Sequence, residues 1–197
     1  MTPATSLSTT DSKTSLTSAT AGASKSTSVM TFDVETNALN PREVTTIHCC
    51  AIHTKTQTQL HKNPKEWLSL LENADVLVGH NIIQYDIPAI QQVYPDFKPK
   101  GKVIDTLILC RMLYPNILDT DFKKKWEGMP IQLYGRHSLE AYGFRLGYSK
   151  RHADLTDFSE LTEELAERCV CDVELNVKLW TRLQPKADSI PCAVDLE

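Results

Sequence analysis

The 197-residue sequence predicts one α/β domain with a mixed β-sheet flanked by helices, preceded by a Ser/Thr-rich tail. Three β-type segments come first, at 29–35, 44–53 and 57–60. A helical segment, a short apolar run at 75–79 and further helical segments follow. Strands joined by short turns pair antiparallel, whereas a strand reached through a helix pairs parallel. This order therefore favours a mixed sheet.

Composition limits the classes of function. The net charge of −4 excludes a broad basic surface for nucleic acid, so any such contact is expected at a strand end. No stretch offers the roughly 20 apolar residues that cross a bilayer, and no apolar secretion signal is present. The six cysteines do not form a C-x-x-C pair, which disfavours structural zinc and indicates a reduced, cytoplasmic protein.

The chain is expected to divide into a tail at 1–28, a domain at 29–185 and a second tail at 186–197. Residues 1–28 are rich in Ser, Thr and Ala and carry no periodic apolar residues. Such a segment buries too little surface to offset its ordering entropy, so we predict disorder. An organellar transit peptide, a linker and a phosphorylated tail remain alternative interpretations of this serine-rich stretch.

Local signals assign the helices. Asn63 and Pro64 are typical of a helix N-terminus, and apolar residues follow at helical spacing. The apolar run at 75–79 fits a central strand parallel to the first one. Helices are then expected from about 84, within the apolar segment 103–112 behind a cap at 105–106, and over 136–147. A final long helix is expected from 156–159 to about Leu183, with Pro185 ending it.

Acidic residues are the candidate chemical groups. Asp33 and Glu35 alternate with Phe32 and Val34 on the first strand, so the two carboxylates project from one face. Paired carboxylates suit Mg²⁺ or Mn²⁺. Asp86 begins the helix after the central strand, and Asp172 lies among apolar residues of the last helix, where a lone charge is costly. Together these oxygens suit two divalent ions about 4 Å apart, as in phosphodiester cleavage.

The order D-x-E, N-x-x-x-Y-D and a third Asp on a C-terminal helix resembles the DEDD (DnaQ-like) superfamily of 3′→5′ exonucleases. The similarity is greatest to the proofreading domain of family A DNA polymerases of short-tailed phages. It implies an RNase H-like fold over about 30–183. The stretches that carry it are Phe32 to Leu39, Val44 to Cys49, Gly79 to Ile90, Ile104 to Arg111, Asp119 to Asp121, His137 to Gly147 and Cys169 to Val173.

The resemblance implies roles for particular residues. Asp33, Glu35, Asp86 and Asp172 match the ligands of two Mg²⁺ or Mn²⁺ ions. Four further residues match positions around the terminal nucleotide, where apolar wedging tolerates any base. They are Thr36 and Leu39 on one segment, and Asn81 and Tyr85 beside the third ligand. Core packing is an equally good interpretation of Tyr85.

The sequence departs from the family at Arg168, where this branch carries a tyrosine that orients the attacking water. Glu167 likewise stands where the other branch uses histidine. Arginine stays protonated and cannot act as a base. Being four residues before Asp172, Arg168 can pair with that carboxylate in competition with metal, or grip the scissile phosphate. We expect a nuclease roughly 10²–10⁴-fold slower than its relatives.

The sequence therefore predicts a 3′→5′ exonuclease that hydrolyses single-stranded DNA ends to mononucleotides. The polymerase domains of the relatives are expected to be absent from the chain, so a separate polymerase chain is a candidate partner. We expect it in the cytoplasm of a bacterial or phage-infected cell, with organellar import as the alternative. Two other functions stay open: a catalytically weak module that binds nucleic acid or a polymerase, and an RNA-trimming enzyme.

Overall fold

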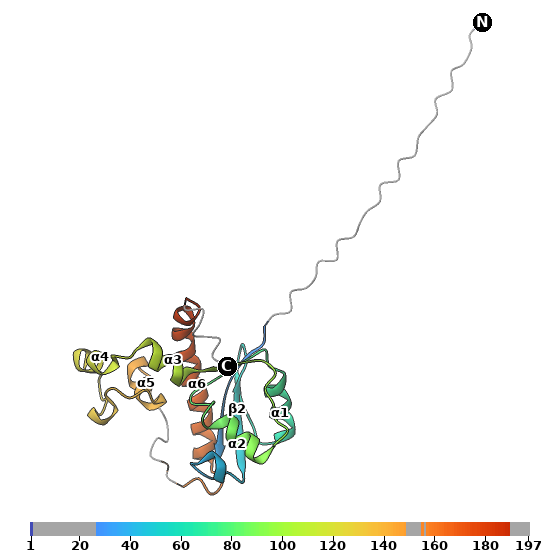
Figure 1. The fold of residues 1–197 in the computed structure, drawn as a ribbon, viewed down its shortest axis with the longest axis horizontal. Helices are drawn as coiled ribbons and strands as arrows, with labels where there is room; N and C mark the ends of the chain where they lie inside the picture. The colour runs from blue at the N-terminus through green and yellow to red at the C-terminus, as the bar shows by residue number, and fades with distance from the viewer. Residues whose placement is uncertain (2–26, 149–154, 156, 190–197) are drawn as a thin grey trace.

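The computed structural model describes residues 1, 27–148, 155 and 157–189, drawn in colour in Figure 1. The predicted tail at 1–28 lies almost wholly outside these residues, as does most of the predicted C-terminal tail. The described residues form a five-stranded mixed sheet in the order β3-β2-β1-β4-β5. This sheet, with its antiparallel and parallel pairs, confirms the predicted α/β class.

Strand β1 (Val29–Thr36) lies at the centre of the sheet. It pairs antiparallel with β2 (Ile47–His53) and parallel with β4 (Val76–Gly79). Strands β3 (Thr58–His61) and β5 (Lys102–Asp105) form the two edges. Both partners of β1 were expected from the turn and the helical crossover that lead to them.

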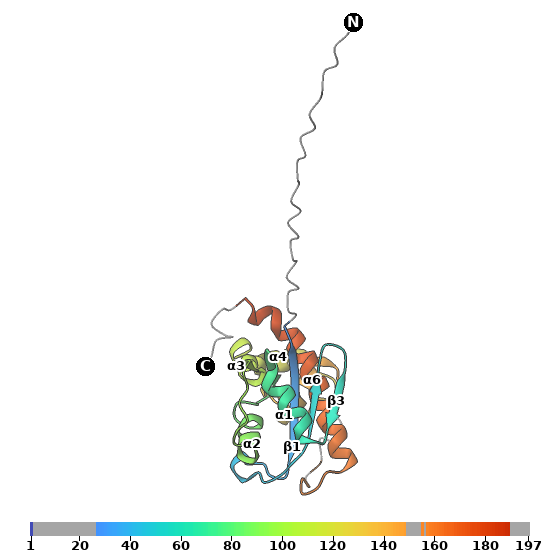
Figure 2. The same ribbon diagram turned by 90° about the vertical axis from the view of Figure 1, so that its right-hand side faces the viewer.

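Helices cover both faces of the sheet (Figure 1). Helices α1 (Pro64–Asn73) and α2 (Asp86–Val93) pack on one face. On the other face, α6 (Glu163–Ala187) contacts β1 to β4, and Figure 2 shows its length relative to the strands. None of the described helices combines the length and the apolar character needed to cross a bilayer.

Four shorter helices complete the described chain. Helices α3 (Thr106–Leu113) and α5 (Leu139–Leu146) pack against α6. Helix α4 (Ile117–Lys124) lies between them in the sequence. The 3₁₀ helices η1 (Pro41–Glu43) and η2 (Ile131–Leu133) lie in connections. In Figure 1, α3, α4 and α5 stand on the opposite side of α6 from α1.

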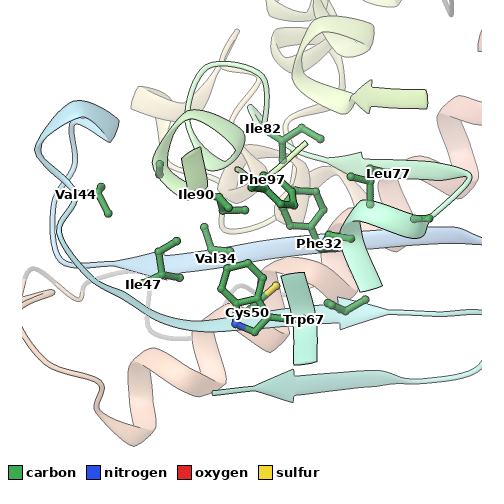
Figure 3. Packing of buried hydrophobic residues seen from close by; sticks show 14 residues of the cluster. Phe32, Val34, Val44, Ile47, Cys50, Trp67, Leu77, Ile82, Ile90 and Phe97 are labelled. Carbon is green, nitrogen blue, oxygen red and sulfur yellow. The ribbon is translucent and has the colours of Figure 1, made fainter. Parts of the chain in front are cut away.

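The alternation of residues along β1 divides the core into two parts. Phe32 and Val34 are buried against Trp67 of α1 and Ile90 of α2, as Figure 3 shows. Each such side chain contributes about 1.5–3 kcal/mol through burial. Successive side chains of a strand point to opposite faces. Asp33 and Glu35, which alternate with Phe32 and Val34, therefore face α6.

One strand was not expected from the sequence. The apolar segment 103–112 was interpreted as leading into a single helix, whereas the structure divides it at Asp105 into β5 and α3. The carboxylate of Asp105 accepts a hydrogen bond from Leu107 N–H, so it caps α3 as predicted. The three residues before it pair with β4, and only this tertiary pairing makes them a strand.

The last helix differs from the prediction at both ends. It begins at Glu163, because Thr162 caps it by accepting from Leu165 N–H, whereas Asp157 accepts from Ser159 N–H in a local turn. It continues through Pro185 to Ala187. Pro185 removes one hydrogen bond and crowds the carbonyl four residues before it, but only two helical residues follow it. The fully buried Ala187 therefore holds the final turn in the core.

Candidate active site

Two carboxylates of β1 face helix α6. Asp33 and Glu35 follow the alternation that sends Phe32 into the opposite core. Helix α6 lies directly against this strand, because the Sγ of Cys169 donates to the backbone carbonyl of Asp33 at 3.5 Å. One ligand atom from each of Asp33, Glu35 and Cys169 lies within 4.8 Å of the other two.

Helix α6 adds a carboxylate and a cation to the same place. Asp172 is 5% exposed and Glu35 is 7% exposed, so both carboxylates are largely removed from water. The Nε of Arg168 lies 3.6 Å from Oε1 of Glu35 and 3.9 Å from Oδ2 of Asp172. Arg168 and Asp172 are four residues apart on the helix, which places them on one face. The guanidinium thus lies between two of the predicted metal ligands.

Asp86 reaches β1 because β4 is short. The pairing of β1 with β4 ends at Thr31, so the N–H of Val34 beyond it donates to Oδ1 of Asp86 at 3.1 Å. Burial raises the pKa of Asp86 to about 7, and the negative charges of Glu35 and Asp105 add to this rise. The hydrogen bond from Val34 acts in the opposite direction. A nearby cation would favour the charged form of this buried carboxylate, so Asp86 is a strong candidate for a cation ligand.

The segment after β1 is tied to the start of α2 through Tyr85. The Tyr85 hydroxyl donates to the carbonyl of Ala38 and lies 2.5 Å from Oγ1 of Thr36. Oγ1 of Thr36 also donates to Ala38, at 2.9 Å. The next residue, Leu39, is 80% exposed. This apolar side chain is therefore accessible to another molecule at the edge of the carboxylates.

The turn after β4 brings His80 and Asn81 to the same edge of the sheet. Asn81 adopts a positive φ of 69°, and its N–H donates to Oδ1 of Asp105 at the end of β5. His80 contacts Oγ1 of Thr106 through Nδ1 and the carbonyl of His137 through Nε2, each at 2.9 Å. Ligands of α/β proteins bind at the carboxyl ends of parallel strands, where these residues lie.

The structure brings every residue predicted for the site to one pocket of about 160 Å³. These residues come from β1 and the segment after it, from the turn before α2 and the first residue of α2, and from α6. The pocket is lined by Asp33, Val34, Glu35, Thr36, Ala38, Leu39, His80, Asn81, Tyr85, Asp86, Phe158, Arg168 and Asp172. Their chemical roles remain predictions. Glu167 lines a different pocket, together with Leu60 of β3 and Tyr148.

Phe158 was missed by the sequence analysis, which placed it inside the last helix. It precedes that helix, and its ring lies 5.2 Å from the guanidinium carbon of Arg168. Its carbonyl is 2.8 Å from Nε2 of His48 on β2. His80 was given no role by the sequence analysis, although it lies in the stretch Gly79 to Ile90. Its position next to Asn81, in the stretch that carried the family resemblance, was the available signal.

The donor set of the pocket fits a hard divalent cation. Asp33, Glu35, Asp86 and Asp172 supply carboxylate oxygens, which Mg²⁺ and Mn²⁺ prefer. The neighbouring Cys169 is a poorer ligand. Its hydrogen bond with Cys49, together with burial, raises the pKa of the Cys169 thiol well above its usual value. Only the thiolate binds metal, so oxygen ligands predominate.

Several solved structures share this fold. Brucella melitensis NrnC with bound Mg²⁺ aligns with a TM-score of 0.60 and 16% identity, over 85% of this chain and 79% of that one. The EXO domain of Aedes aegypti Nibbler gives 0.57 and 12%, over 84% and 81%. Exonuclease I gives 0.54 and 14%, over 81% and 42%. These likenesses confirm the predicted RNase H-like exonuclease fold.

The sequence is also similar to two phage polymerases. It is 34% identical over 158 residues to the DNA-directed DNA polymerase of Escherichia phage T7, covering 72% of this chain and 22% of the relative. The corresponding enzyme of Enterobacteria phage T3 is 32% identical over 162 residues, covering 74% and 23%. The chain belongs to the DnaQ-like (DEDD) exonuclease superfamily.

Within this superfamily the chain is related to phage polymerases, as the D-x-E and N-x-x-x-Y-D stretches predicted. It spans less than a quarter of the length of these two polymerases. No protein-family model matches the chain. Membership in the DnaQ-like superfamily relates the carboxylate pocket to the nuclease sites of that superfamily.

Proposed function

We propose that this protein is a divalent-metal-dependent 3′→5′ exonuclease that releases mononucleotides from single-stranded DNA. One observation carries the proposal: carboxylates from β1, α2 and α6, distant in the sequence, line one pocket in a DnaQ-like fold. The Mg²⁺-bound structure of the neighbour NrnC supports a metal at such a site. The relation to the T7 and T3 polymerases supports DNA as the substrate.

Asp33, Glu35, Asp86 and Asp172 would hold the metal, with two ions as the family resemblance implies. Bound divalent ions supply a hydroxide at neutral pH and stabilise the leaving 3′ oxygen. The remaining residues position the strand. Leu39 would wedge against the last bases, and Thr36 and Asn81 would contact the terminal nucleotide. Tyr85 would act indirectly, by fixing the segment that carries Leu39.

The experiment that tests this proposal uses a single-stranded DNA with a fluorophore at its 5′ end. In Mn²⁺, the full-length chain should shorten this strand stepwise from the 3′ end, and EDTA should stop the reaction. A second substrate labelled at its 3′ nucleotide should lose its label in the first step. The Asp33→Ala, Glu35→Ala double variant, purified identically, is the control for contaminating nucleases. Equal activity in the control would refute the proposal.

A matched RNA strand in the same assay tests the second substrate class. The neighbour NrnC has been solved bound to the dinucleotide pGG, which motivates short substrates in the comparison. We expect DNA to be degraded faster, because the 30%-level sequence identity is to DNA polymerases. A faster reaction on RNA would instead identify an RNA-trimming enzyme.

A catalytically weak binding module is the other candidate, and Arg168 favours it. The guanidinium between Glu35 and Asp172 occupies part of the region where the divalent metal ions would bind. In that case the chain would bind a strand end, or a separate DNA polymerase chain, without cleaving. Strand binding that is equal in the wild type and the double variant, with no cleavage by either, would support this alternative. The described cysteines are buried and form no disulfide with one another, which supports the cytoplasmic location that we propose.

A further inference from the structure

Arg168 has an unusual environment for a helix-borne arginine. Its Nε is buried and, among the described residues, has no hydrogen-bond partner. The distances of 3.6 Å to Glu35 and 3.9 Å to Asp172 are too long for hydrogen bonds, so the attraction is electrostatic. The ring of Phe158 covers the guanidinium at 5.2 Å. The cation is therefore held between two carboxylates without being locked to either.

The charges of the pocket explain what such a cation does there. Four carboxylates bring four negative charges, and the guanidinium supplies one positive charge. One divalent ion leaves the pocket slightly negative, whereas a second ion makes it positive unless an anion also binds. A phosphodiester group is the anion that a nuclease receives. The second ion is thus disfavoured until a strand end arrives.

We propose that Arg168 occupies one of the two cation positions of this pocket, the one bounded by Glu35 and Asp172. In the absence of nucleic acid the protein then binds one divalent ion tightly and a second only weakly. When a strand end binds, the guanidinium leaves the carboxylates for the phosphate, and the second ion enters. This inference rests on the proposed function for its substrate, but its metal stoichiometry can be measured without any reaction.

The test counts Mn²⁺ ions bound to the full-length chain, without nucleic acid, from the EPR signal of free Mn²⁺. The wild type should bind one ion over the concentration range in which Arg168→Met binds two. Methionine keeps an unbranched apolar stem but removes the guanidinium and its charge. The apparent Kd of the second ion should fall by about 10–100-fold, the range seen when a group next to a metal ligand is changed.

Two further variants make the measurement specific. Arg182→Met removes an exposed arginine from the same helix, outside the carboxylate pocket, and should bind Mn²⁺ like the wild type. Phe158→Ala removes the ring that covers the guanidinium without changing any charge. Phe158→Ala should strengthen the binding of the second Mn²⁺ ion, but by less than Arg168→Met does. It also tests the inference if Arg168→Met does not fold, as far-UV circular dichroism would reveal.

The outcomes separate this inference from the proposed function. Identical Mn²⁺ titrations of the wild type, Arg168→Met and Phe158→Ala would overturn it, as would two equal, tight sites in the wild type. A gain of the second ion in Arg168→Met supports it even if none of the proteins cleaves DNA. Cleavage by a wild type that shows two equal sites would leave the exonuclease proposal standing and remove the role of Arg168.

Discussion

Arg145 on α5 donates two hydrogen bonds to the carboxylate of Asp121 on α4, from Nε at 3.0 Å and from Nη2 at 2.7 Å. The Asp121 side chain is 0% exposed and the Arg145 side chain is 4% exposed. Trp126 and the N–H of Gly135 donate to the same carboxylate, each at 2.9 Å. This fully hydrogen-bonded pair joins α4 to α5, and Asp121 belongs to a stretch that carried the family resemblance.

Replacing Asp121 with alanine should lower the free energy of unfolding by about 3–5 kcal/mol, because Arg145 would remain buried without its partner. Urea denaturation followed by circular dichroism measures the change. Asp119→Ala is the matched control, since Asp119 is exposed on the same helix and should shift stability by less than about 0.5 kcal/mol. Equal losses from both variants would contradict a structural role for the pair.

The contribution of Asp86 to the stability of the metal-free protein should decrease as pH rises from about 4 to 7. Burial raises the pKa of Asp86 to about 7 in the folded state, from its usual value of 3.8. The folded state therefore holds a proton that the unfolded state has released between these values. The slope from this one group is at most about 1.4 kcal/mol per pH unit, and it disappears above the folded pKa.

The measurement compares the wild type with Asp86→Asn in EDTA, by urea denaturation at several pH values. The asparagine oxygen can still accept from Val34, but it does not ionise. Its stability advantage should grow between pH 4 and pH 7 and then level off. Excess Mg²⁺ should reverse the order at pH 8, since a ligand of the folded state stabilises it. A difference independent of pH would show that Asp86 titrates normally.

Replacing Leu39 with alanine should weaken binding of a single-stranded DNA end without affecting stability. Leu39 is 80% exposed, so its side chain contributes little to the core. If it packs fully against bases, its loss should cost up to about 2.4 kcal/mol of binding, because the change removes three carbon groups at about 0.8 kcal/mol each. Fluorescence anisotropy with an oligonucleotide whose 3′ linkages are phosphorothioates measures the affinity. Leu118→Ala, at an exposed leucine of α4, should bind like the wild type.

Replacing Arg168 with tyrosine should raise the rate of strand shortening, by as much as 10²–10⁴-fold if the hydroxyl orients the attacking water. The change also removes the cation that lies between Glu35 and Asp172. Arg168→Phe separates the two effects, because it removes the charge without supplying a hydroxyl. Turnover should increase most in the tyrosine variant. An unchanged or lower rate for Arg168→Tyr would count against this account of the position.

Local patterns in the sequence were sufficient for most of the scaffold. The helix start at Asn63 and Pro64 appears as predicted, with Asn63 accepting from Lys65 N–H. Gly147 ends α5 with a φ of 63° in the left-handed region, as a C-terminal glycine should. These signals succeed because they depend on neighbouring residues alone. Strand β5 has no such signal, because only its pairing with β4 distinguishes it from the helix that follows.

The sequence by itself determined which acidic residues are candidates and which face of β1 two of them share. Side chains alternate along a strand whatever surrounds it, so Asp33 and Glu35 had to project together. Only the tertiary structure decided that Asp86 bonds to the unpaired edge of β1, and that Arg168 lies between Glu35 and Asp172 under Phe158. Those relations depend on where β4 ends and on how α6 packs against the sheet, which the local sequence does not specify.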